Sequence, residues 1–159
     1  MPIAIEMTHD AADSDACARM MALTDPWITL GRSYERCLAA VSDPMRELYV
    51  ARDDQTVAGF ILLIMKGQFP GYIASVCVDA SYRGSGIGTQ LVAFAEERIH
   101  RDSPNVFLCV SSFNVGARRL YERLGFEYVG AFKNFIVEGH DELLYRKTIG
   151  PWSSFTPAD

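Results

Sequence analysis

The chain has 159 residues and a mass of 17.7 kDa, which suits one domain with its own hydrophobic core. Hydrophobic residues make up 49% of the sequence and charged residues 22%, which argues against a disordered or fibrous protein. The formal net charge is −5 and the pI is about 5.2, whereas nucleic-acid-binding domains usually carry a basic face. We therefore expect no nucleic-acid partner.

Localisation signals and cysteine spacing are also informative. No stretch approaches the roughly 20 apolar residues that span a bilayer, and residues 1–10 contain no Lys, no Arg and no long apolar core. We therefore expect no membrane partner and no signal peptide. Cys17, Cys37, Cys77 and Cys109 form no CxxC pair and no zinc-type cluster, so we expect buried reduced thiols, no metal and no cysteine nucleophile. Together these features predict a cytoplasmic protein.

Apolar periodicity and turn residues predict alternating strands and helices, typical of an α/β protein with a mixed sheet. In chain order we expect a strand over 2–7, helices over 10–23 and 30–41, strands over 47–52, 57–65 and 72–78, a helix from 87 to 99, a strand over 106–110, a short helix over 115–124 capped by Asn114, and strands over 126–137 and 143–149. The tail 150–159 is irregular, and Trp152 and Phe155 are candidates to anchor it to the body or to a second subunit.

A glycine-rich turn joins the predicted strand 72–78 to the predicted helix 87–99. It contains Arg83-Gly-Ser-Gly-Ile-Gly88, and the helix begins inside it. Glycine lets backbone N–H groups approach a ligand, and N–H groups at a helix start lack partners and carry the positive end of the dipole. The turn therefore predicts an anion site, most naturally for phosphates. Its spacing fits neither a P-loop nor a GxGxxG dinucleotide fingerprint.

On these residues the sequence resembles the GNAT superfamily of N-acetyltransferases. The coenzyme A loop of that superfamily reads Gln/Arg-x-x-Gly-x-Gly/Ala, which residues 83–88 match at every position. A second segment, Asn114-x-x-Ala-x-x-Leu-Tyr121-x-x-x-Gly-Phe126, is similar to another element of the family. The resemblance implies the acyl-CoA N-acyltransferase fold, with a mixed, mostly antiparallel sheet of about seven strands flanked by about four helices. It also implies one domain over 1–159, with 1–54 on the acceptor side, 72–124 as the acetyl-CoA-binding core and 150–159 as a tail.

The same resemblance implies direct transfer of an acetyl group from acetyl-CoA to an amine. It implies that acetyl-CoA is held by Val76, Cys77, Val78, Arg83, Gly84, Ser85, Gly86, Ile87, Gly88, Thr89, Asn114, Ala117 and Tyr121. In that arrangement the amide of Val78 stabilises the oxyanion, and the phenol of Tyr121 protonates the departing thiolate as general acid. On periodicity alone, however, Tyr121 shares an apolar stripe with Leu120 and Leu124 and would be a core residue.

The sequence leaves the general base and the acceptor pocket open. The general base stays open among Glu127, Glu138, His140, Asp141, Glu142 and a water molecule. Residues 133–145 are similar to a segment of the ribosomal-protein N-terminal acetyltransferases, but Cys109 stands where those enzymes often carry a catalytic glutamate. Trp27, Tyr34 and Phe69 are candidates for the acceptor pocket, or else core and loop anchors. Residues 1–54 hold ten acids and five bases, an excess that would attract a cationic amine.

We therefore predict an acetyl-CoA-dependent N-acetyltransferase that acts on a small amine or an amino-acid-like acceptor. Two alternatives are an acetyltransferase of peptide N-termini and a non-catalytic sensor that binds acyl-CoA. A homodimer through the tail or an edge strand is a further expectation.

Overall fold

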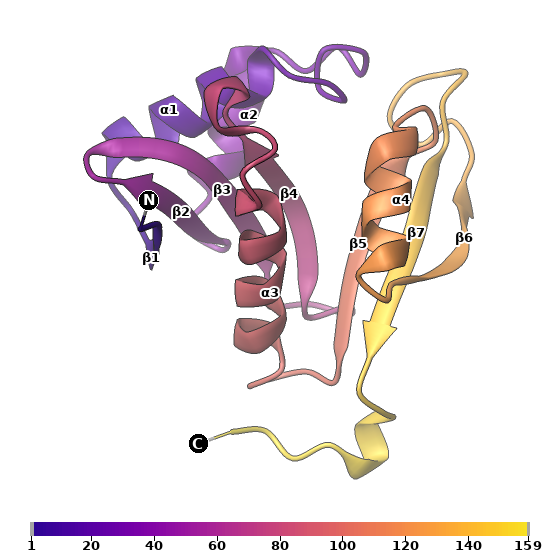
Figure 1. Ribbon diagram of the computed structural model, residues 1–159. Helices are drawn as coiled ribbons and strands as arrows, with labels where there is room; N and C mark the ends of the chain where they lie inside the picture. The colour runs from indigo at the N-terminus through magenta and orange to yellow at the C-terminus, as the bar shows by residue number, and fades with distance from the viewer. Residues whose placement is uncertain (1, 159) are drawn as a thin grey trace.

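The computed structural model of the protein describes residues 2–158 (Figure 1). Within this range the strands are β1 (Ala4–Met7), β2 (Glu47–Asp53), β3 (Thr56–Ile64), β4 (Tyr72–Val78), β5 (Asn105–Ser111), β6 (Glu127–Phe132) and β7 (Glu142–Thr148). The α-helices are α1 (Ala11–Ala22), α2 (Tyr34–Val41), α3 (Ile87–Ile99) and α4 (Val115–Arg123), with short 3₁₀ turns at Ala80–Tyr82 and Trp152–Ser154.

The described strands form one sheet in the order β1-β2-β3-β4-β5-β7-β6, in which only the β4–β5 pair is parallel. This is the mixed, mostly antiparallel sheet with four flanking helices that the resemblance implies, so the predicted fold class is confirmed. The parallel pair is possible because α3 connects β4 to β5 and returns the chain to the same end of the sheet.

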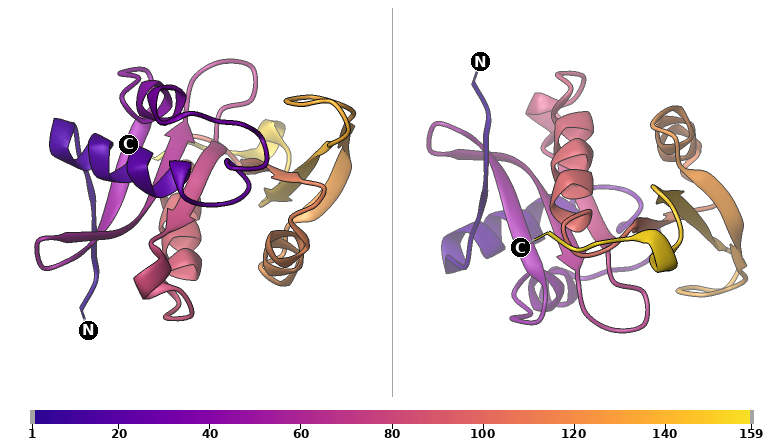
Figure 2. Two further views of the ribbon diagram at one scale, coloured as in Figure 1. Left: turned by 90° about the horizontal axis from the view of Figure 1, so that it is seen from above. Right: turned by 90° about the horizontal axis from the view of Figure 1, so that it is seen from below.

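The helices cover both faces of the sheet (Figure 2). On one face, α3 places Ile87, Leu91 and Ile99 in a core that also includes Ile61 and Val106. On the other face, α1 and α2 cover a second core that contains Cys17, Cys37, Val50, Phe60 and Cys77. Because side chains alternate along a strand, β2 and β3 supply both cores, which explains why residues 57–65 are apolar almost without interruption.

Two predicted elements have an end that differs from the structure by more than two residues. The second helix begins at Tyr34 instead of residue 30, because Ser33 caps it by accepting a hydrogen bond from the Arg36 N–H at 3.2 Å. The predicted strand 126–137 ends at Phe132. The following loop, 133–141, turns at Asn134, whose φ is 52°, and the Asn134 side chain accepts a hydrogen bond from the Gly139 N–H at 2.8 Å.

β4 and β5 separate soon after they begin. They pair at Tyr72↔Phe107 and Ile73↔Leu108, and their carboxyl ends then diverge (Figure 1). The register of β4 against β3 shifts so that Leu63 faces Ile73 and Leu62 faces Ser75. The intervening Ala74 is thus an extra residue, and such a bulge bends and twists its strand. The bend leaves the edge of β4 beyond Ala74 unpaired on the β5 side.

The tail is attached to the body by backbone hydrogen bonds. The Ile149 N–H donates to the Pro104 carbonyl at 3.0 Å, and the Ala158 N–H donates to the Arg101 carbonyl at 2.8 Å. Trp152 contacts Phe155, with ring centroids 5.6 Å apart, but is itself 50% exposed. No helix within residues 2–158 has the length and apolar character that crossing a membrane requires.

Candidate active site

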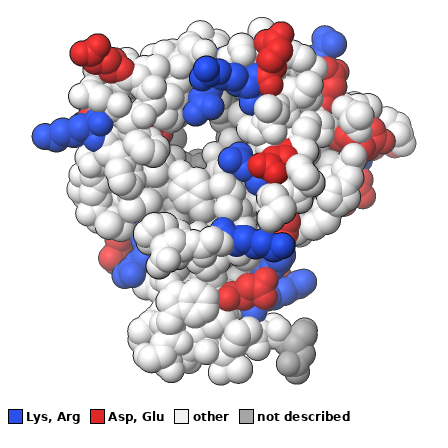
Figure 3. Space-filling view, turned by 180° about the vertical axis from the view of Figure 1, so that it is seen from behind, with Lys and Arg blue, Asp and Glu red and all other residues white. Residues whose placement is uncertain are grey.

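A cavity of about 520 Å³ lies where β4 and β5 diverge. Its lining reaches from Ala117 and Tyr121 of α4, on one face of the sheet, to Arg36 and Cys37 of α2, on the other. Figure 3 shows a hollow on the face opposite α3 and α4, with basic side chains on its rim. The cavity therefore gives two ligands access to the same gap from opposite faces of the sheet.

The glycine turn forms the start of α3 on the first face. Gly84 and Gly86 have φ values of 80° and 85°, in the left-handed region that favours glycine. A Cβ on either residue would meet no atom within 4 Å, so the space in front of the turn is open. Gly86 is the N-cap of α3 and supplies no side-chain cap, which leaves the amides of the first turn for a ligand.

Arg83 turns toward β4 instead of extending over the glycines. Its Nε donates to the Val78 carbonyl at 3.3 Å, and its guanidinium donates to the Thr24 hydroxyl at 3.2 Å. Val76, Cys77 and Val78 line the cavity along the unpaired edge of β4. An extended chain placed in the gap can therefore pair with the β4 backbone as an added strand does.

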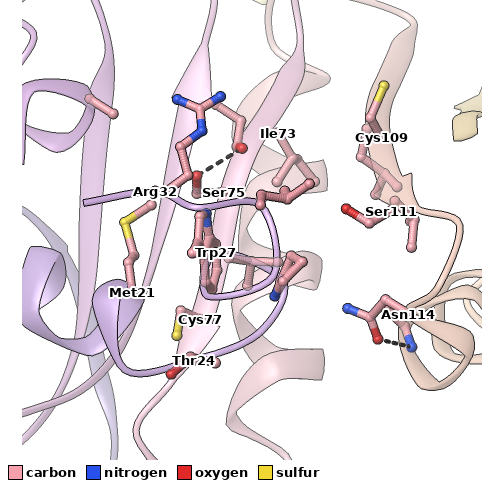
Figure 4. A pocket seen from close by; sticks show the side chains of 18 of the residues that line it. Met21, Thr24, Trp27, Arg32, Ile73, Ser75, Cys77, Cys109, Ser111 and Asn114 are labelled. Atoms are coloured by element: carbon pink, nitrogen blue, oxygen red, sulfur yellow. Dashed lines mark hydrogen bonds between the residues drawn. The ribbon is translucent and has the colours of Figure 1, made fainter. Parts of the chain in front are cut away.

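α4 closes the β5 side of the gap. The Oδ1 atom of Asn114 accepts a hydrogen bond from the Ala117 N–H at 3.2 Å, and the Asn114 amide nitrogen points toward the gap (Figure 4). Tyr121 lines the cavity and is only 7% exposed, and its ring packs edge-on against Phe126. Burial raises the pKa of the Tyr121 phenol, so it keeps its proton at neutral pH. Tyr121 thus belongs both to the core and to the cavity wall.

Ser111 and Glu142 face the cavity from the other side of the sheet. They are register partners on β5 and β7, and the Ser111 hydroxyl donates to the Glu142 Oε2 at 2.6 Å. Val110 belongs to the core on the α3 face, so strand alternation directs Ser111 and Glu142 to the α2 face. Figure 4 shows the Ser111 oxygen directed into the gap.

The electrostatic environment of Glu142 is unusual for a carboxylate. The side chain is 6% exposed, and burial raises the pKa of Glu142, although Ser111, Arg32 and His140 oppose the shift. A buried carboxylate with a raised pKa on the wall of a cavity is a candidate proton acceptor.

The other four candidates for the base lie outside the lining of the cavity. Glu127 and Glu138 are exposed, His140 packs its ring against Phe113 at a centroid distance of 4.8 Å, and Asp141 accepts a hydrogen bond from the Asn134 N–H at 3.3 Å. Of the five side chains that the sequence leaves open, Glu142 is therefore the one that lines the cavity.

Of the three aromatic candidates for the acceptor pocket, one lines the cavity and two do not. Trp27 lines the cavity and lies over β4 (Figure 4). Tyr34 lies outside the lining of the cavity. Its hydroxyl donates a hydrogen bond to the Asp15 carboxylate at 2.5 Å, and this bond connects α2 to α1. Phe69 also lies outside the lining, is 63% exposed, and contacts Phe107 with ring centroids 5.6 Å apart.

Cysteine thiols at the site are protonated at neutral pH. Cys77 and Cys109 both line the cavity. Burial raises the pKa of Cys77 to about 11 and also raises the pKa of Cys109. Neither thiol therefore has the lowered pKa of a reactive cysteine. Within residues 2–158, no three His, Cys, Asp or Glu side chains are grouped in a way that would hold a metal ion.

The charge of the cavity differs from the expectation for residues 1–54. Of their ten acids, only Asp25 lines the cavity, whereas Arg32, Arg36 and Arg46 all do. Several of the acids are engaged elsewhere: Asp13 by Arg52, Asp15 by Arg19 and Glu47 by Arg98. The acidic excess is thus used largely for structural contacts outside the cavity.

Several cavity residues have no signal in the sequence. Ser111 and the three arginines come from elements that adjoin the gap only in the folded chain, and Phe135 and Ile136 reach it from the loop 133–141. This loop begins where β6 ends, at Phe132.

Comparison with known proteins agrees with this geometry. A family model described as "Acetyltransferase (GNAT) family" matches residues 11–126. RimI of Mycobacterium tuberculosis, an N-alpha-acetyltransferase, is 29% identical over 151 residues, which cover 87% of this chain and 89% of that protein. Mycothiol acetyltransferase of Brachybacterium faecium is 37% identical over 91 residues, which cover 53% of this chain but only 27% of that longer protein. A solved aminoglycoside 6'-N-acetyltransferase complexed with coenzyme A has a TM-score of 0.73 at 21% identity, covering 95% of this chain and 98% of that one.

The chain belongs to the GNAT acetyltransferase family, as its glycine turn and its Asn114 segment indicate. The acyl donor of these acetyltransferases is acetyl-CoA, and the residues present fit it. The open turn at Gly84 and Gly86 leaves room for a diphosphate, and the unpaired edge of β4 can pair with the amides of a pantetheine arm.

Proposed function

We propose that the protein transfers an acetyl group directly from acetyl-CoA to a primary amine, and that residues 1–159 act as one N-acetyltransferase domain. The observation that supports this proposal is the cavity, which extends from Arg83, the first residue of the glycine turn, to a buried carboxylate on the other face of the sheet, while Gly84 to Thr89 lie outside its lining. Such a gap allows a thioester and an amine to meet within one enclosure.

Acetyl-CoA supplies the activated acetyl group when it is bound. The first-turn amides of α3 bind its diphosphate, and the β4 backbone from Val76 to Val78 holds its extended arm, with the Val78 amide as donor to the thioester oxygen. The Asn114 amide contributes a further donor from α4.

Two side chains handle the protons. Glu142, on the α2 face, accepts a proton from the acceptor ammonium group, and its raised pKa brings it closer to the pKa of an amine. Tyr121, on the α3 face, retains its proton at neutral pH and donates it to the departing sulfur. The placement of the two groups on opposite faces supports these separate roles.

The acceptor that we favour is a small amine or an amino-acid-like molecule, because the cavity of about 520 Å³ must hold the thioester end of acetyl-CoA as well as the acceptor. A peptide N-terminus is the second candidate, and the similarity to RimI over nearly the whole chain favours it. Release of free thiol from acetyl-CoA, measured over an amine panel and a short-peptide panel, tests the activity and separates the two acceptors.

The role of Tyr121 is tested by Tyr121→Phe. We expect kcat to fall by about 10²-fold, the usual contribution of a general acid, while the affinity for CoA in calorimetry is retained. Leu120→Val, on the same helix but outside the lining of the cavity, is the control and should retain kcat. An unchanged kcat in Tyr121→Phe would remove the phenol from the mechanism.

A further inference from the structure

Arginine side chains dominate the charge of the cavity. The lining contains Arg32, Arg36, Arg46 and Arg83 but only two carboxylates, Asp25 and Glu142. This positive wall lies inside a protein whose formal net charge is −5. Fixed positive charge around a partly enclosed space raises the local concentration of anions.

Two of these arginines have no acidic partner in the fold. Within residues 2–158, Arg52 and Arg98 form salt bridges to carboxylates at 2.5 and 2.8 Å, whereas Arg32 and Arg36 form none. Arg46 approaches Asp43 only at 3.7 Å. Asp25, the nearby acid of the lining, instead accepts hydrogen bonds from the backbone and hydroxyl of Thr29 at 3.0 and 2.6 Å. The guanidinium groups of Arg32 and Arg36 therefore remain available to a ligand.

Arg32 lines the cavity from the loop between α1 and α2. Its backbone N–H donates to the Trp27 carbonyl at 2.9 Å, which fixes the loop between α1 and α2. Figure 4 shows its side chain extending along β4 beside Ser75. Arg32 and Glu142 both line the cavity, and the charge of Arg32 lowers the pKa of Glu142 against the effect of burial.

The diphosphate of the acyl donor does not account for these two arginines. The anion-binding turn opens α3 on one face of the sheet, whereas Arg36 belongs to α2 and Arg32 precedes α2 on the other face. Arg83, in contrast, belongs to the glycine turn itself. Arg32 and Arg36 thus line the cavity on the face where the proposed function places the acceptor.

We propose that the acceptor carries a carboxylate beside its amine, and that Arg32 and Arg36 bind this carboxylate while the amine lies near Glu142. The inference rests on the proposed function and names the chemical class of its substrate. A planar guanidinium matches a carboxylate through paired hydrogen bonds.

Matched acceptors test the charge directly. We would measure kcat/KM for peptides that differ only by Glu or Gln at the second position, and for free amino acids against their amides. We expect the carboxylate member of a pair to be favoured at least about tenfold, the effect of a hydrogen-bonded charge. The peptide arm or the amino-acid arm that shows this preference identifies the source of the carboxylate.

Variants assign the preference to the arginines. In Arg32→Gln, and in the double variant that combines Arg32→Gln with Arg36→Gln, the preference for the carboxylate acceptor should fall to about twofold or less. The affinity for CoA should be unchanged in both variants. Arg19→Gln is the control, because the Arg19 side chain is 71% exposed on α1 and lies outside the cavity. Equal kcat/KM for both members of every pair in the wild type would overturn the inference, and so would a preference that survives in the double variant.

Binding to the CoA-saturated protein separates this inference from the proposed function. If no acceptor releases thiol from acetyl-CoA, the proposed activity fails, and calorimetry with the same pairs still decides the inference. Tighter binding of the carboxylate member that is lost in Arg32→Gln would support it. Equal affinity within each pair, or tighter binding of a phosphoserine peptide than of the Glu peptide, would overturn it.

Discussion

Removal of the Ser111 hydroxyl should shift the acidic limb of the pH–rate profile to higher pH. In the folded protein this hydroxyl donates to the Glu142 carboxylate at 2.6 Å and favours its charged form. In Ser111→Ala the carboxylate stays buried but loses that donor, so the pKa of Glu142 rises further. A base with a higher pKa is protonated, and inactive, over a wider acidic range.

The size of the effect follows from the hydrogen bond that is lost. A hydrogen bond to a charged group contributes roughly 1.5–3 kcal/mol, and 1.36 kcal/mol corresponds to a tenfold change. We therefore expect kcat/KM of Ser111→Ala to be at least about tenfold lower on the acid side of the profile. On the alkaline plateau, where Glu142 is ionised in both proteins, the two rates should converge.

The assay is kcat/KM against pH for the wild type, Ser111→Ala and Glu142→Gln, with thiol release as the readout. Glu142→Gln should lose the acidic limb and fall by roughly 10²–10⁴-fold, the contribution of a general base. Ser112→Ala is the matched control, because the Ser112 hydroxyl accepts a hydrogen bond from the Asp141 N–H at 3.2 Å and does not touch Glu142. An acidic limb that coincides in Ser111→Ala and the wild type would refute the assignment of Glu142 as the base.

Two further predictions concern the acyl-donor turn and stability. Gly86→Asp places a negative charge and a side chain at φ 85° at the start of α3, so calorimetry should show CoA binding weakened at least about tenfold. Gly139→Asp, at φ 90° in the loop between β6 and β7 and away from the start of α3, should bind CoA like the wild type. Arg52→Ala leaves the buried Asp13 with Thr8 as its remaining hydrogen-bond partner and should lower the free energy of unfolding at pH 7 by about 2 kcal/mol in urea, less than a fully buried pair would lose because Arg52 is 24% exposed. Arg52 holds the pKa of Asp13 below its ordinary value, so the stabilisation is present above that ordinary value and disappears as the pH falls through the lowered one; a stability of Arg52→Ala equal to that of the wild type would contradict this account.

Local sequence determined the part of the site that we propose binds the acyl donor. The glycine turn, the start of α3 and the Asn114 cap of α4 depend on backbone conformations and hydrogen bonds between residues a few positions apart. Such features are visible in sequence because only certain residues adopt them without strain. The strand β4 was predicted with its observed bounds for a similar reason, since turns flank an unbroken apolar run.

Tertiary structure alone decided the acceptor side. Ser111 and Glu142 are 31 positions apart, and they meet because the β5–β7 register makes them partners on one face of the sheet. Arg32 and Arg36 reach the same cavity because α2 packs over that face and β4 bends away at its bulge. Net charge in the sequence pointed toward a cationic acceptor, whereas the fold directs most of those acids into structural contacts and leaves arginines facing the gap. The sequence gives the number of charged residues, but the strand register and the helix packing determine where each charged side chain lies.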